Sequence, residues 1–214
     1  MIEWIFFDLG STLLDEEIAY RYYIKRCVKK LQLLGIVEVS EQSYREKIEA
    51  NAHQNLDPIG STWQYFAQTE PRPLWTNEGV RLYPETIDVL EKLSQNYRLG
   101  IIANQSSSIR ELLKEWGIES YFQLIILSEE VGLSKPDTTI FTLALQKANI
   151  PAERVVYVGD RYDNDILPAK SLGMWTVRIL TGFGKHASEN EKLKSDWVIP
   201  SLQEITNIFE QTKN

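Results

Sequence analysis

The side chains of this sequence that can do chemistry are three aspartates and a lysine. Asp8 follows a run of four large apolar residues, and Lys135 lies within Ser134-Lys135-Pro136-Asp137. Asp160 and Asp165 are five residues apart, so a turn brings both toward one point. Carboxylate and carbonyl oxygens with one or two waters describe a Mg²⁺ site. We therefore predict a magnesium site in which Lys135 balances the remaining negative charge and Asp8 stays ionised as a nucleophile.

These polar residues come at the ends of apolar runs. Residues 4–7 are large and apolar and are followed by Gly10-Ser11, which predicts a strand buried on both faces of a parallel sheet. Open α/β sheets bind ligands at the carboxyl ends of their strands. A buried carboxylate is costly unless a positive group meets it, so Asp8 predicts a metal ion or a lysine from elsewhere in the chain. Taken alone, Asp8 is as well explained by a turn or a helix cap.

From residue 84 onward, strand and helix patterns alternate. The predicted strands are 99–103, 122–127, 155–158, 175–179 and 198–199. The predicted helices begin at Pro84, span 108–116, 138–148 and 166–172, and begin again at Ser201. Strands that alternate with helices form a parallel sheet with right-handed crossovers. The fold class is therefore α/β, a Rossmann-like parallel sheet with helices on both faces.

The segment 16–82 has apolar residues at helical spacing and no convincing strand pattern. We predict a helix that ends at Gly35, a second that begins with a capping box of Ser43 and Glu46, and a third around Trp63. The sequence thus predicts two domains. They are an α/β core of residues 1–15 and 83–214 and an inserted all-helical cap of residues 16–82.

Each polar segment alone has an ordinary structural explanation, but all of them lie at strand ends in a consistent order. Together they resemble the motifs of the haloacid dehalogenase (HAD)-like hydrolase superfamily, in the subgroup with a small helical cap. Asp8 with Thr12 is similar to the first motif, Ala103-Asn104 to the second, Ser134–Asp137 to the third, and Gly159-Asp160 with Asn164-Asp165 to the fourth. The resemblance covers nearly the whole chain.

The resemblance implies phosphoryl transfer through an aspartyl-phosphate on Asp8, with Mg²⁺ as cofactor. The metal ligands would be Asp8, the carbonyl of Gly10, Asp160 and Asp165. Lys135 would be catalytic and would hold both the nucleophile and the phosphoryl oxygens. Asn104 and Gln105 would also bind phosphate.

The sequence departs from the family pattern at two positions. Phosphatases of this family usually carry an aspartate two residues after the nucleophile, which protonates the leaving group and later activates water; here that residue is Gly10. They usually have Ser or Thr where this chain has Ala103. Gln105 and Ser106 either replace the missing hydroxyl donor or start the next helix.

A positioned acid or base contributes roughly 10²–10⁴-fold to a rate, so losing one need not abolish activity. Either the substrate has a leaving group of low pKa, or another carboxylate replaces the missing one. Asp15, Glu16 and Glu17 are the candidates. We prefer the simpler interpretation that these acids favour the N-terminus of the first cap helix.

Two other functions compete with a Mg²⁺-dependent phosphatase. Gly10 and Ala103 are also compatible with a catalytically degenerate HAD-like protein that binds a phosphorylated ligand or a partner. A 2-haloacid dehalogenase, in which Asp8 attacks carbon without a metal, is disfavoured. Carboxylates arranged for a cation, here Asp160 and Asp165, would repel its carboxylate substrate.

Composition narrows the partners. The 214 residues carry a net charge of −7 and no basic block, which argues against nucleic acid or an anionic membrane as the main partner. Cys27 is the only cysteine, so no disulfide framework is expected. No apolar run approaches the roughly 18 residues of a membrane helix, and the N-terminus lacks a signal pattern. We expect a cytoplasmic protein that acts on a small phosphorylated metabolite, with the substrate's identity and the oligomeric state left open.

Overall fold

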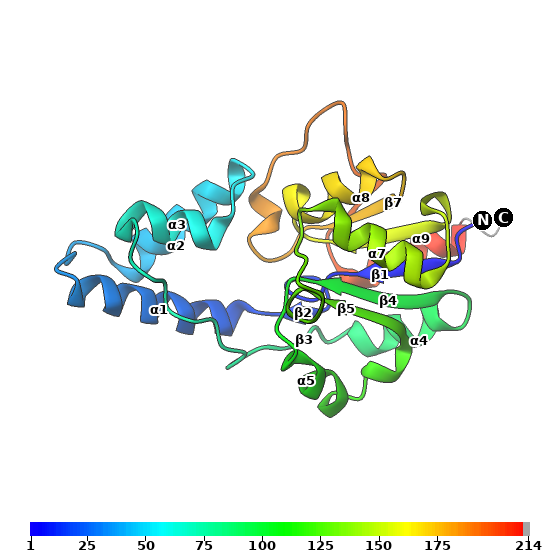
Figure 1. Cartoon of the computed structure of the whole chain (residues 1–214), viewed down its shortest axis with the longest axis horizontal. Coiled ribbons are helices and arrows are strands. Elements are labelled where there is room, and N and C mark those ends of the chain that lie inside the picture. The colour runs from blue at the N-terminus through cyan, green and yellow to red at the C-terminus, as the bar shows by residue number, and fades with distance from the viewer. Residues whose placement is uncertain (212–214) are drawn as a thin grey trace.

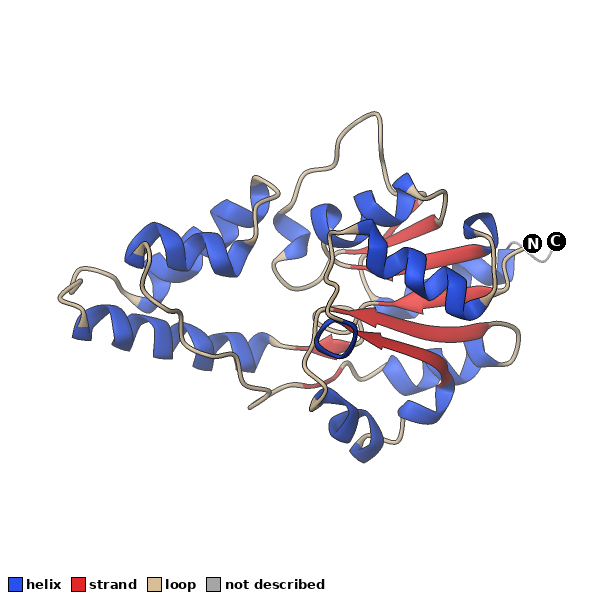
Figure 2. Ribbon diagram, viewed as in Figure 1, coloured by secondary structure: helices blue, strands red, loops and turns tan. Residues whose placement is uncertain are grey.

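The structure, a computed structural model, describes residues 1–211 of the chain. Its centre is a six-stranded sheet in the order β5-β4-β1-β6-β7-β8, and all neighbouring strands are parallel (Figure 2). The strands are β1 (Trp4–Phe7), β4 (Arg98–Ala103), β5 (Phe122–Leu127), β6 (Val155–Gly159), β7 (Trp175–Ile179) and β8 (Trp197–Ile199). This arrangement confirms the predicted α/β, Rossmann-like fold class.

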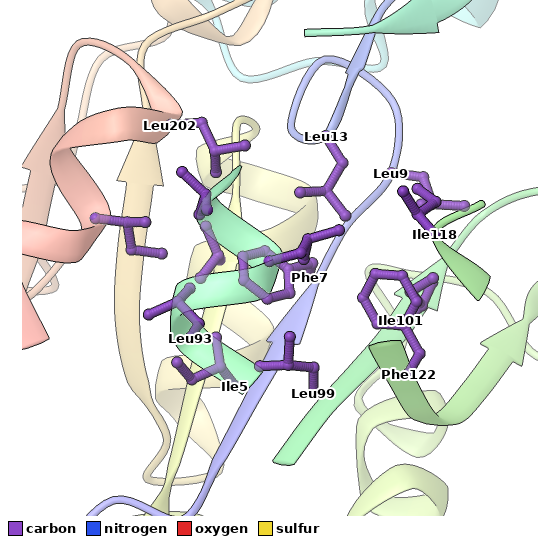
Figure 3. Packing of buried hydrophobic residues seen from close by; sticks show 14 of the residues in the cluster. Ile5, Phe7, Leu9, Leu13, Leu93, Leu99, Ile101, Ile118, Phe122 and Leu202 are labelled. Carbon is purple, nitrogen blue, oxygen red and sulfur yellow. The ribbon is translucent and has the colours of Figure 1, made fainter. Parts of the chain in front are cut away.

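Strand β1 lies inside the sheet and supplies side chains to both of its faces. Ile5 and Phe7 belong to one apolar cluster (Figure 3), and their register partners on β4 are Leu99 and Ile101. Trp4 and Phe6 belong to a second cluster on the opposite face. All four residues are buried, and burying each large apolar side chain contributes about 1.5–3 kcal/mol. The short apolar run therefore packs against a hydrophobic cluster on each face of the sheet.

Helices cover both faces of the sheet. They are α4 (Thr86–Ser94), α5 (Ile109–Glu115), α6 (Ser128–Val131), α7 (Thr138–Ala148), α8 (Leu167–Ser171) and α9 (Ile205–Gln211). Residues of α4, α5 and α9 pack in the cluster of Ile5 and Phe7. Residues of α7 and α8 pack in the cluster of Trp4 and Phe6. The sheet is thus the middle layer of three.

Three further helices project from the carboxyl end of the sheet, at the left of Figure 1. They are α1 (Glu17–Leu33), α2 (Glu41–His53) and α3 (Pro58–Ala67), and they share an apolar cluster of their own that includes Tyr23, Leu31 and Ile48. Phe183, from the loop after β7, also packs in this cluster. The separate cluster supports the predicted division into a core of residues 1–15 and 83–214 and a cap of residues 16–82, which stays a prediction. We refer to residues 16–82 as the helical insert.

A two-stranded antiparallel ribbon joins the helical insert to the core. Strand β2 (Leu14–Asp15) pairs with β3 (Arg81–Leu82), and Arg81 forms an ion pair of 2.7 Å with Asp15. The expectation that residues 16–82 contain no strand is therefore wrong at Arg81–Leu82. A two-residue strand is too short to show an alternating pattern, so this pairing has no periodic signal in the sequence.

Two helix starts also differ from their predictions. Helix α2 is capped by Ser40 and Ser43, whose side chains each accept a hydrogen bond from the other's backbone amide, and not by Ser43 and Glu46. Helix α4 begins at Thr86 and not at Pro84. A serine three residues from a serine is not the usual Ser/Thr with Glu/Gln pattern of a capping box, which is why the spacing pointed to the wrong pair.

Candidate active site

Asp8 and Lys135 contact each other where β1 ends. The Asp8 amide donates to the carbonyl of Val158 on the neighbouring strand, which extends the sheet register to this residue. Lys135 Nζ lies 2.7 Å from Asp8 Oδ1, 2.6 Å from Asp165 Oδ1 and 3.0 Å from the Tyr157 hydroxyl oxygen. An ammonium group has three N–H donors, so each has an acceptor. The side chain of Lys135 is almost fully buried, and its charge is offset by the two carboxylates.

The amide side chain of Asn104 holds the segment that carries Lys135. Asn104 Nδ2 donates to the Lys135 carbonyl oxygen and Asn104 Oδ1 accepts from the Lys135 amide, both at 2.8 Å. Asn104 directly follows β4, so the sheet fixes the lysine through this pair of hydrogen bonds. Asn104 therefore positions Lys135. Its predicted contact with phosphate, like that of Gln105, stays a prediction.

The three predicted aspartates meet at one point. Each of Asp8, Asp160 and Asp165 offers a carboxylate oxygen, and these three oxygens lie within 4.8 Å of one another. A π-helical turn over Tyr162–Ile166, just before α8, brings Asp165 back to the end of β6, where its Oδ2 accepts from the Arg161 amide at 2.9 Å.

Gly159 makes this close approach possible. A Cβ atom at that position would lie 2.5–2.6 Å from the Asp165 side chain. A larger residue at the end of β6 would therefore displace Asp165 from both Lys135 and the Arg161 amide. The helix that the sequence predicts over residues 166–172 begins one residue later, at Leu167.

The electrostatics of this cluster suit a divalent cation. Burial, together with the charges of Asp165 and Asp8, raises the pKa of Asp160 well above its usual range. Burial raises the pKa of Asp8 to about 6, against the opposing effect of Lys135. Asp160 is 4% exposed, so its carboxylate is held almost entirely out of solvent. Three carboxylates face one ammonium, and hard oxygen ligands with surplus negative charge fit Mg²⁺.

A cavity of about 720 Å³ opens above the cluster, between the strand ends and the helical insert. The core lines it with Asp8, Gly10, Asn104, Gln105, Ser106, Ser128, Lys135, Pro136, Asp160 and Arg161. The insert lines it with Glu16, Tyr20, Tyr23, Asp57, Ile59, Arg72 and Trp75. This volume is typical of a site for a small molecule. All of the predicted site residues except Asp165, which is fully buried beneath, line this cavity.

The two unusual positions of the motifs have different surroundings. Ala103 is fully buried in the apolar cluster of Ile5 and Phe7. Gln105 and Ser106 lie in the coil before α5 and line the cavity, which rules out the interpretation that they begin that helix. Ser106 Oγ shares a hydrogen bond of 2.6 Å with Ser108 Oγ.

Gly10, in contrast, lies against a carboxylate. A Cβ atom on Gly10 would be 2.7 Å from Glu16 Oε2 and 2.9 Å from Glu16 Oε1. Glu16 is 6% exposed, and Ser11 Oγ donates to its Oε2 at 3.3 Å. Burial and the negative charge of Asp8 raise the pKa of Glu16 to about 8.

Of the three acids near residue 16, Glu16 stands at the N-cap position of α1, and the interpretation that these acids favour the N-terminus of that helix stays a prediction. The Glu16 side chain caps no amide of α1, and it lines the cavity instead. Asp15 does accept from the Glu17 amide at 3.0 Å, and Glu17 forms an ion pair with Arg45, so these two acids are structural. The sequence offers no signal that separates the three, because the separation depends on the path of the turn.

Three comparisons with known proteins bear on this site. The chain matches the family model of haloacid dehalogenase-like hydrolases over residues 5–179. It is 34% identical over 236 aligned positions to a glyceraldehyde 3-phosphate phosphatase of Methanocaldococcus jannaschii, covering 100% of this chain and 99% of that protein. It is 33% identical over 128 positions to the pyrimidine 5'-nucleotidase YjjG of Escherichia coli, covering 59% and 56% of the two chains. A predicted phosphoglycolate phosphatase from Haemophilus somnus has the same fold, with a TM-score of 0.72, 20% identity and 97% and 98% coverage.

This chain belongs to the haloacid dehalogenase-like hydrolase family. The resemblance stated from the motifs is confirmed, and so is the prediction that the protein is a hydrolase. Within residues 1–211, none of the helices has the length and apolar character needed to cross a membrane.

Proposed function

We propose that this protein is a Mg²⁺-dependent phosphatase that hydrolyses a small phosphorylated metabolite through an aspartyl-phosphate on Asp8. The observation that carries the proposal is the convergence of three carboxylates and one buried lysine beneath the cavity. Asp8 is the only one of these carboxylates that combines a place in the cavity wall with a contact to Lys135. It is therefore the carboxylate best placed to meet a phosphorus atom.

Each residue of the cluster has a distinct role in this proposal. Lys135 orients Asp8 and Asp165 and favours the ionised form of the nucleophile. Asp8, Asp160, Asp165 and the Gly10 carbonyl would hold Mg²⁺. When bound, the ion would neutralise the surplus carboxylate charge and polarise the phosphoryl oxygens.

The substrate class is supported by relatives and by the size of the cavity. The glyceraldehyde 3-phosphate phosphatase of M. jannaschii aligns with the whole chain, including the helical insert. A cavity of about 720 Å³ suits a small metabolite. Glyceraldehyde 3-phosphate is therefore the first substrate to test, with a pyrimidine 5'-nucleotide as the second.

The test measures phosphate release from a panel of phosphoesters with Mg²⁺ or EDTA, for the wild type and Asp8→Asn. We expect Mg²⁺-dependent release by the wild type and a loss of at least about 10³-fold in the variant, because the nucleophile is removed. Asp88→Asn is the matched control, since Asp88 is an exposed residue of α4 and should leave the rate unchanged. Activity that survives in Asp8→Asn would overturn the proposed nucleophile.

A further inference from the structure

We propose that Glu16 is the residue that transfers protons to the leaving group and from water, in place of a side chain at position 10. This inference rests on the proposed phosphatase function and assigns a further catalytic residue to it. It stands on three observations: where the carboxyl group lies, what surrounds it, and how the chain turns to put it there.

The carboxyl group of Glu16 occupies the space into which a side chain at position 10 would project. Both of its oxygens lie within 3 Å of the point where a Gly10 Cβ would be. Gly10 is two residues beyond Asp8, and all three residues line the cavity. An in-line attack by Asp8 directs the leaving oxygen away from Asp8 and into the cavity that Glu16 also lines.

The surroundings of Glu16 give its burial no structural explanation. Its contacts are with the hydroxyl groups of Ser11 and Tyr20, and no lysine, arginine or histidine of the described chain forms an ion pair with it. The flanking acids are different, since Asp15 pairs with Arg81 and Glu17 with Arg45. Burying a carboxyl group without a cation is costly. A functional site is where such a cost is tolerated.

The turn between β1 and α1 explains how the side chain returns to the nucleophile. The Leu9 carbonyl accepts from the amides of Thr12, Leu13 and Leu14, which folds the chain back on itself. Ser11 adopts a left-handed backbone conformation with φ of 55°, and its hydroxyl reaches Glu16. Glu16 is the residue just before α1, at the point where the chain leaves the core for the helical insert.

The chemistry balances with the groups present. A carboxylate oxygen of Asp8 attacks phosphorus, the bond from phosphorus to the leaving oxygen breaks, and the protonated Glu16 gives its proton to that oxygen. In the second step, Glu16 takes a proton from water as the water oxygen attacks the phosphorus of the aspartyl-phosphate. The bond to Asp8 then breaks and phosphate leaves. Both carboxyl groups are returned to their starting states, and the net change is an ester plus water giving an alcohol plus phosphate.

The experiment compares Glu16→Gln with the wild type on two substrates in pre-steady-state measurements of leaving-group release, with substrate in excess over enzyme. Glyceraldehyde 3-phosphate has an alkoxide leaving group that needs a proton, whereas the nitrophenolate of p-nitrophenyl phosphate leaves without one. We expect release from glyceraldehyde 3-phosphate to fall about 10²–10⁴-fold. We expect one equivalent of nitrophenol per enzyme to be released at close to the wild-type rate, followed by slow turnover while the aspartyl-phosphate persists.

Two further variants separate chemistry from folding. Glu17→Gln, the matched control at the partly exposed neighbour, should leave both rates within about twofold because Glu17 forms ion pairs with Arg21 and Arg45 and does not line the cavity. The double variant Gly10→Asp with Glu16→Ala should be at least about tenfold faster than Glu16→Ala alone, because it restores a carboxyl group to the same space. Gly10 has no left-handed backbone conformation, so the main chain accepts aspartate there.

The outcomes distinguish the two proposals. Equal losses of leaving-group release on both substrates in Glu16→Gln, or no loss on either, would overturn the role of Glu16. If Asp8→Asn is inactive at the same time, the phosphatase proposal still stands. A wild type that releases no leaving group from any phosphoester would overturn the phosphatase proposal and the role of Glu16 with it. In that case, activity gained by the double variant alone would favour a degenerate member of the family.

Discussion

The strand ends of the core and the junction with the helical insert each bury a carboxyl group against the same cavity, but in opposite electrostatic settings. Asp8 has the Lys135 ammonium 2.7 Å away, and burial raises its pKa only to about 6. Glu16 has hydroxyl neighbours and no cation, and burial together with the charge of Asp8 raises its pKa to about 8. Two titratable groups whose environments push their pKa values apart are typical of a nucleophile and an acid–base partner.

The comparison also separates two ways of building a site. The strand-end cluster is held by the sheet, because Asp8, Asn104 and Asp160 follow neighbouring parallel strands. Glu16, in contrast, follows a single turn and directly precedes α1, the first helix of the insert. Any movement of α1 relative to the sheet would move Glu16 and leave the cluster unchanged. The junction therefore links the position of the insert to the proposed proton transfer.

Removing Lys135 is expected to have the largest effect, because it takes away the cation that distinguishes the setting of Asp8 from that of Glu16. Lys135→Ala would leave Asp8 and Asp165 buried beside each other without their cation, which costs about 3–5 kcal/mol when one partner of a buried pair is removed. We expect the free energy of unfolding in EDTA, measured by urea denaturation, to fall by that amount, and phosphate release to fall at least about 10³-fold. Lys114→Ala, which breaks an exposed ion pair with Glu111, should cost less than about 1 kcal/mol. Equal stability losses in the two variants would contradict the role assigned to Lys135.

The strand-end cluster was predictable from the sequence because each part has a local signal. The apolar run 4–7 ends at Asp8, and the strands 122–127 and 175–179 and the helix 138–148 have the predicted bounds. In a parallel sheet, carboxyl ends of neighbouring strands meet at one edge, so residues far apart in the sequence are brought together by topology alone. The pairing of Asn104 with the backbone of Lys135 has no such signal, since it joins two loops.

The role of Glu16 could not be predicted for a different reason. Asp15, Glu16 and Glu17 are consecutive acids at the start of a helix, and the N-terminal dipole explains all three equally well. Which one turns inward depends on the left-handed Ser11 and on the hydrogen bonds of Leu9, and neither leaves a periodic pattern. The missing side chain at Gly10 was visible in the sequence. That the carboxyl group of Glu16 fills this space is known only from the three-dimensional path of the turn.

The second prediction tests whether the carboxylates at the strand ends bind Mg²⁺. Asp160→Asn removes a buried carboxylate of the proposed metal site, so it should lower Mg²⁺ affinity by roughly 100-fold or more. The measurement is thermal unfolding with and without Mg²⁺. We expect the ion to raise the Tm of the wild type and of Asp196→Asn, a control that lies in a partly exposed ion pair with Lys170, but not that of Asp160→Asn. A wild-type Tm that does not respond to Mg²⁺ would argue against the metal site.

The last prediction concerns the part of the pH dependence of stability that Glu16 contributes. In the metal-free protein its pKa is raised from 4.5 to about 8, so the folded chain binds more protons than the unfolded chain between these values. Its contribution to stability is therefore fully present below about pH 4.5 and is lost as the pH rises through about 8. Glu16→Gln has no proton to lose and should become the more stable protein, by on the order of 5 kcal/mol at pH 9, with little difference at pH 4.5. Urea unfolding in EDTA at several pH values measures this difference. Glu17→Gln keeps the buried carboxyl group of Glu16, so its free energy of unfolding should vary with pH as that of the wild type does. If the free energy of Glu16→Gln varied with pH in the same way, Glu16 would be ionised like a surface acid and the prediction would be wrong.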